Sequence, residues 1–126
     1  MPNPKLNFII VCDNAFLTQG TNSLNIIGIF DRVGAEKFPA VHPRIVVVTN
    51  IMGDVGEYNQ IITFKNKSTG EKIAELSGKL SINVIGQKAQ FIGNFFNIVF
   101  PFAGEYVFEV SIDNKLQDLI ANVYVG

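Results

Sequence analysis

The sequence predicts an all-β fold, an antiparallel β-sandwich of about eight or nine strands. The first observation is composition: isoleucine and valine together number 29, against 14 for leucine and alanine, and there are 11 phenylalanines. β-Branched and aromatic side chains pack well on pleated sheets, whereas leucine and alanine are better helix formers. The second observation is periodicity, because apolar and polar residues alternate along short segments separated by turn residues.

Residues 101–125 carry the clearest pattern and predict a β-hairpin. Every second residue from 106 to 112 is apolar, so this strand offers one face to a core, with Glu109 on the opposite face. Asp113 and Asn114 follow, and both residue types tolerate the positive φ of a two-residue turn.

The return segment of this hairpin, residues 115–125, has two interpretations. Leu116, Leu119 and Ile120 have helical spacing, which allows one helical turn within residues 115–122. We expect instead a strand with a bulge near Gln117, which would return Leu119 and the later apolar residues to one face.

Three strands are predicted in the first half of the chain, over residues 6–13, 24–33 and 44–52. The first and third are apolar on both faces, which is typical of central or covered strands. Residues 14–23 are mostly polar and predict a loop.

Glycine and proline mark two special places in this half. Gly28 lies inside the second predicted strand and indicates a bulge or the close approach of another backbone. Residues 34–43 contain Pro39 and Pro43, which cannot donate ladder hydrogen bonds, so this segment predicts a crossover to the opposite sheet.

The second half contains four further predicted strands, over residues 58–65, 71–76, 80–84 and 91–100. Charges at Glu71, Lys72 and Glu75 indicate that the second of these is peripheral. The last is the most aromatic segment and ends before Pro101.

The length of 126 residues suits one domain, residues 1–126, which is large enough for a core without disulfides or metals. Ten basic and eleven acidic residues give a net charge of −1, which favours neither nucleic acid nor an anionic membrane as a partner.

The apolar run at residues 8–12 ends at Asp13, before a signal-peptide core is complete. Cys12 is the single cysteine and suits a buried position in a reducing compartment. We therefore expect a cytoplasmic protein.

No group of residues predicts catalysis, a cofactor or a metal site. His42 is the only histidine, and no partner stands at ligand spacing around it, so we expect a structural residue of the crossover. Asp31, Asp54 and Glu57 match no calcium-binding loop and are interpreted as turn residues. We predict that the protein is not an enzyme and that it needs no cofactor.

One modest basic cluster is present, formed by Lys65, Lys67, Lys72 and Lys79. Two glutamates interrupt it, so we interpret it as a solvated face at a strand edge rather than as a nucleic-acid groove.

Five segments of the chain carry a family resemblance. They are Phe-Ile-Ile-Val-Cys-Asp at residues 8–13, Leu-Asn-Ile-Ile-Gly-Ile-Phe-Asp at 24–31, Phe-Pro-Ala-Val-His-Pro at 38–43, Gly-Asp-Val-Gly-Glu-Tyr at 53–58 and Phe-Pro-Phe-Ala-Gly-Glu-Tyr-Val-Phe at 100–108. In this order they resemble a family of short, functionally uncharacterised bacterial all-β proteins. The resemblance implies an immunoglobulin-like or related β-sandwich, and it implies no activity.

Without a chemical site, we expect a non-catalytic interaction or assembly module that holds a protein partner or a second copy of itself. Strands that are apolar on both faces, with no helix to cover them, favour a symmetric dimer through a sheet face or edge. The alternative is a sandwich that binds a small ligand or carbohydrate with its end loops, although the lack of tryptophan argues against an aromatic sugar platform. A broad apolar patch would favour assembly, and a concave polar pocket would favour a ligand.

The first testable prediction is metal independence. Because no ligand set is visible, the midpoint of thermal unfolding should be the same with a chelator and with added calcium or zinc. Circular dichroism melts measure this directly. A reproducible rise of several degrees with one ion would contradict the prediction and point to Asp31, Asp54 and Glu57.

Overall fold

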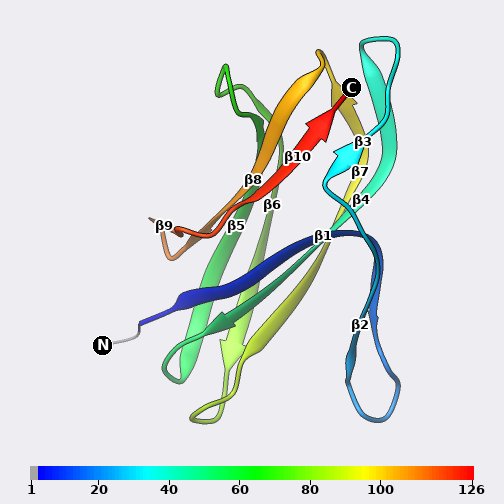
Figure 1. Cartoon of the computed structure of the whole chain (residues 1–126). Coiled ribbons are helices and arrows are strands. Elements are labelled where there is room, and N and C mark those ends of the chain that lie inside the picture. Colours follow the sequence, from blue (N-terminus) through cyan, green and yellow to red (C-terminus); the bar gives the residue numbers. More distant parts are fainter. Residues whose placement is uncertain (1–2) are drawn as a thin grey trace.

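The computed structural model describes residues 3–126, which form ten strands and no helix in two facing sheets (Figure 1). The strands are β1 (Lys5–Leu17), β2 (Leu24–Ile29), β3 (Arg32–Val33), β4 (Ala40–Met52), β5 (Gly56–Asn66), β6 (Lys72–Ile82), β7 (Ala89–Phe100), β8 (Gly104–Ile112), β9 (Lys115–Leu116) and β10 (Ala121–Val125).

The two sheets confirm the predicted all-β antiparallel sandwich. The first sheet has the order β2-β1-β4-β7, and the second has the order β3-β10-β8-β5-β6, with β9 paired to β8. Every pair is antiparallel except β3 with β10, which is parallel. Within the described residues, no helix is available to cross a membrane.

The division of the chain into strands differs from the prediction in two places before the final hairpin. Residues 24–33, predicted as one strand, divide at Phe30 into β2 of the first sheet and β3 of the second. Residues 71–84, predicted as two strands, form the single strand β6, which continues through Gly78. A Cβ at Gly78 would lie 2.7 Å from Cε1 of Phe91, so this glycine lets β6 pack closely against β7.

The C-terminal hairpin forms as predicted, with φ of 49° at Asp113 and 67° at Asn114. Strand β9 covers only two residues, after which residues 117–120 leave the ladder and β10 resumes pairing with β8. The bulged interpretation is therefore correct, and no helical turn forms there. The expected position of Leu119 was wrong: it lies among residues 117–120, which are outside the ladder, and its side chain is 44% exposed.

An aromatic cluster between the sheets forms the centre of the core. The ring centroids of Phe64 on β5 and Phe108 on β8 lie 4.2 Å apart. The ring centroid of Phe95, on β7 of the first sheet, lies 5.3 Å from that of Phe108. Tyr106 is also buried, and its hydroxyl donates a 2.7 Å hydrogen bond to the carbonyl of Phe102. The apolar face predicted for residues 106–112 therefore packs between the two sheets, with its aromatic residues at the centre of the core.

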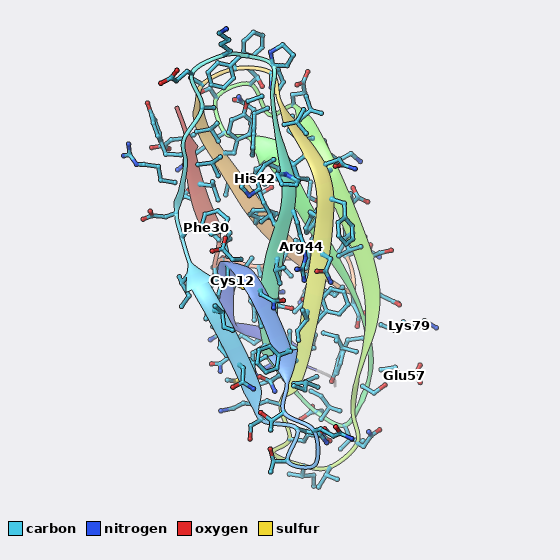
Figure 2. All side chains as sticks on the ribbon, turned by 90° about the vertical axis from the view of Figure 1, so that its right-hand side faces the viewer. Cys12, Phe30, His42, Arg44, Glu57 and Lys79 are labelled. Carbon is cyan, nitrogen blue, oxygen red and sulfur yellow. The ribbon has the colours of Figure 1, made fainter. Side chains whose placement is uncertain are left out.

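Strand β1 bends after Cys12, and its second half pairs with β2 over the outer face of the first sheet (Figures 1 and 2). The expected loop at residues 14–23 is therefore wrong at its start, because β1 extends to Leu17, whereas β2 begins at Leu24 as predicted. The hairpin buries Cys12, Val46 and Val48 completely. These residues need no second subunit to cover them, which removes one premise of the expected dimer.

The start of β4 also differs from the prediction, because the strand begins at Ala40 rather than Arg44. Pro43 lies inside the strand, opposite Asn97 of β7, which has φ of 51°. Strand β1 pairs with β4 only from Val46 onward, so residues 40–45 have β7 as their one neighbour. A proline is tolerated where one edge of a strand is free.

Core substitution provides the second testable prediction. Phe108→Ala removes a fully buried ring from the aromatic cluster and should lower the free energy of unfolding by about 3–5 kcal/mol. Glu109→Ala removes only a partly exposed ion pair with Lys65 and should cost about 0.5 kcal/mol or less. Urea denaturation measures both values. Equal costs for the two variants would contradict the assigned register of β8.

Candidate functional site

His42 lies on β4, not in the crossover where the sequence placed it. It belongs to the half of the strand that β1 leaves unpaired, and its side chain is half-buried. The His42 and Phe30 rings are 6.2 Å apart between centroids, with their planes at 45° (Figure 2). The only histidine therefore lies beside the point where the chain passes from β2 to β3.

A cavity of about 260 Å³ opens at this place and is named here the β4-edge cavity. Its lining residues are Asp13, Phe30, Arg32, Val33, Gly34 and His42. The sequence showed no carboxylate close to His42 along the chain, but the fold brings Asp13 of β1 to the same cavity. Three segments that carry the family resemblance, residues 8–13, 24–31 and 38–43, each contribute a lining residue.

Gly28 accounts for the position of the Asp13 side chain. Its φ is +71°, and a Cβ at this residue would lie 2.3 Å from Oδ2 of Asp13. Any other residue would be strained and would displace the carboxylate. The sequence predicted a bulge or the close approach of another backbone at Gly28, whereas the group that approaches it is the side chain of Asp13.

Arg32 lies between this cavity and a second one. Its guanidinium carbon is 4.7 Å from the centroid of the Tyr124 ring, a cation–π contact. Tyr124 lines the second cavity, of about 180 Å³, together with Asp31 and Glu105. The positive charge of Arg32 is therefore drawn toward this second, acidic cavity.

The other two carboxylates considered for calcium, Asp54 and Glu57, are not gathered with Asp31. Asp54 lies in the turn between β4 and β5, where its carbonyl accepts a hydrogen bond from the Tyr58 hydroxyl. Burial, followed by the nearby Asp54 charge, raises the pKa of Tyr58. Over residues 3–126, no three histidine, cysteine, aspartate or glutamate side chains are grouped to hold a metal ion.

Cys12 is fully buried under the β1–β2 hairpin, as expected for a small core residue (Figure 2). Its Sγ lies 3.6 Å from the carbonyl oxygen of Val46, to which the thiol donates. Burial raises the pKa of the Cys12 thiol, with the charge of Asp13 adding to the effect. A buried, protonated thiol is a poor nucleophile.

Three of the four lysines in the basic cluster have acidic partners. Lys65 lies 2.8 Å from Glu109, and Lys67 lies 3.5 Å from Glu105. Lys72 likewise lies 2.8 Å from Glu75 on the exposed edge strand β6. These charges are locally balanced, which is typical of a solvated face.

Lys79, the fourth lysine, borders a groove of about 610 Å³, named here the hairpin groove. It lies between the tip of the β1–β2 hairpin and the segment joining β6 to β7, and its lining residues are Leu17, Asn22, Lys79, Leu80, Ser81, Gln87, Lys88, Ala89, Gln90 and Ile92. Two lysines and no acidic residue line it.

An apolar area remains uncovered on the outer side of the first sheet, beyond the reach of the β1–β2 hairpin. Val41 of β4 and Val99 of β7 are directly paired and are 62% and 45% exposed, and Phe96 of β7 is 64% exposed. Phe96 and Val99 also line a groove of about 310 Å³ between β7 and β6. These three residues are named here the open face.

Comparison with known proteins gives a family but no activity. No curated protein matches the chain. A family model described as a family of unknown function (DUF6941) matches residues 7–122, the greater part of the sequence. The chain therefore belongs to the DUF6941 family, which agrees with its resemblance to functionally uncharacterised all-β proteins.

Proposed function

We propose that this domain is a non-catalytic assembly module that pairs with a second copy of itself through the open face. The observation that carries the proposal is the exposure of Val41, Phe96 and Val99 on one side of the first sheet. Monomeric soluble proteins rarely expose large contiguous apolar patches, and such patches mark interaction surfaces.

Strand β7 favours a second copy over a charged partner. Its residues, Ala89–Phe100, include no charged side chain, and β4 is its one hydrogen-bonded neighbour. Edge strands normally carry charges that prevent association, as β6 does with Lys72, Glu75 and Lys79. An uncharged surface can meet its own copy across a two-fold axis without repulsion between like charges.

The contact should use the sheet face rather than extend the sheet at its edge. Asn97 has a positive φ in the middle of the open face, and this backbone conformation interrupts the regular row of backbone groups that a new strand would need. Arg44, the cation beside Phe96, is already bound by hydrogen bonds to Asn94 and Asn14 (Figure 2).

The proposal includes an immunoglobulin-like topology. The order β1-β4-β7 facing β10-β8-β5 corresponds to strands A-B-E facing G-F-C of an immunoglobulin domain. The hydrogen bond from the Tyr106 hydroxyl to the Phe102 carbonyl matches the tyrosine corner of such domains. A cytoplasmic location is also proposed, supported by the single buried thiol of Cys12.

A second candidate function is small-ligand or carbohydrate binding in the hairpin groove. Its volume of about 610 Å³ lies within the usual range for ligand pockets. Lys79 and Lys88, without an acidic neighbour in the lining, would favour an anionic ligand.

Self-association is the third testable prediction. Light scattering coupled to size exclusion should give the mass of two chains at micromolar concentration. Phe96→Asp places a carboxylate on each side of the two-fold interface and should raise the dimer dissociation constant at least about tenfold. Leu116→Asp is the matched control, because Leu116 is also 64% exposed but lies on β9 of the other sheet.

Two results would contradict this proposal. One is a single-chain mass for the natural protein across micromolar concentrations, and the other is equal weakening by Phe96→Asp and Leu116→Asp. Either result would leave the hairpin groove as the stronger candidate for function.

A further inference from the structure

We propose that the β4-edge cavity binds an organic ammonium ion, with Asp13 supplying the negative charge and with Phe30 and His42 supplying adjacent aromatic walls. The proposal rests on different residues from the open face and does not depend on self-association. It concerns the ammonium group itself, carried by a free small molecule or by a lysine side chain of another protein.

The polar groups of this cavity have unused hydrogen-bonding capacity. Within residues 3–126, neither the Asp13 carboxylate nor the His42 imidazole has a hydrogen bond or an ion pair with another protein group. Arg32 lines the same cavity, yet its guanidinium stacks on Tyr124 rather than pairing with Asp13. The carboxylate therefore keeps its charge available to a ligand.

Each of these groups is nevertheless held in place by packing. The Asp13 carboxylate lies against Gly28, where a Cβ would displace it. Phe30 packs against the main core, and its ring fixes one side of the His42 ring. A site whose parts are positioned in advance loses little conformational entropy when a ligand binds.

The chemistry of the lining selects the class of ligand. A cation is attracted to the face of an aromatic ring within about 6 Å of its centroid, and a carboxylate beside the ring strengthens the attraction. The negative charge of Asp13 would repel an anion. A structural metal ion would need more ligands than one carboxylate and one imidazole supply, and no larger set is grouped in the described residues.

The size of the cavity is compatible with this class. Its volume of about 260 Å³ equals the liquid volume of roughly nine water molecules, at about 30 Å³ each. That space accommodates an alkylated ammonium head or the end of a lysine side chain, but not a large cofactor.

Nuclear magnetic resonance titration of the whole chain tests this proposal. Choline should shift the signals of Asp13, Phe30 and His42, with a dissociation constant on the order of a millimolar, as for a single cation–π and carboxylate contact. Its uncharged isostere 3,3-dimethylbutanol should shift them much less. Added salt should weaken choline binding, because the attraction depends on charge.

Two variants and a control assign the effect to residues. Asp13→Asn keeps the shape of the side chain and should weaken choline binding at least about tenfold, and Phe30→Leu should weaken it several-fold. Asp31→Asn is the matched control, because Asp31 is also exposed but lines the second cavity. It should leave the dissociation constant unchanged.

A parallel titration with Nα-acetyl-lysine methylamide separates the two sources of the ammonium group. Tighter binding of the lysine derivative assigns the site to a protein partner, and tighter binding of choline assigns it to a free small molecule. No shifts with either probe would overturn the proposal. Equal shifts with choline and 3,3-dimethylbutanol, or equal weakening by Asp13→Asn and Asp31→Asn, would overturn it as well.

Discussion

The arrangement of the candidate surfaces depends on a bend in β1 after Cys12, where this strand stops pairing with β4. Up to this residue β1 pairs with β4, and beyond it β1 pairs only with β2. The bent hairpin then covers one half of the outer side of the first sheet and leaves the other half open. The same departure frees the edge of β4 over residues 40–45, and the β4-edge cavity lies beside that edge.

The bend is stabilised on both of its sides. Ala15, Leu24 and Ile26 of the hairpin pack against Val46 and Val48, and full burial of a valine side chain contributes on the order of 1.5–3 kcal/mol relative to exposure. On the other side of the first sheet, Ile45 and Val47 of β4 and Phe95 of β7 are buried in the main core against the second sheet. The departure of β1 therefore costs the main core little, because that core is completed by β5 and β8.

The sequence pattern predicted those features that depend only on residues close together in the chain. The alternation over residues 106–112 and the turn at Asp113 and Asn114 depend on neighbours along the chain, and both are confirmed. The hairpin over the outer face could not be predicted, because strands apolar on both faces look the same whether their own chain or a second subunit covers them. The sequence also could not predict that Asp13 and His42 line the same cavity, because their proximity depends on the order of strands in the sheet. Gly28 was the one local signal of that site.

Successive side chains of β4 point to opposite faces of the first sheet, so neighbouring residues belong to different candidate sites. Val41 points outward with Val99 and belongs to the open face, whereas the next residue, His42, lies beside Phe30 at the cavity. An apolar contact surface and a charged cavity can therefore share one stretch of backbone without sharing side chains. Such an arrangement requires a strand with one free edge and one uncovered face, and the bend of β1 supplies both. The two proposed activities are thus separable by substitution even though a single irregularity of the fold creates the space for each.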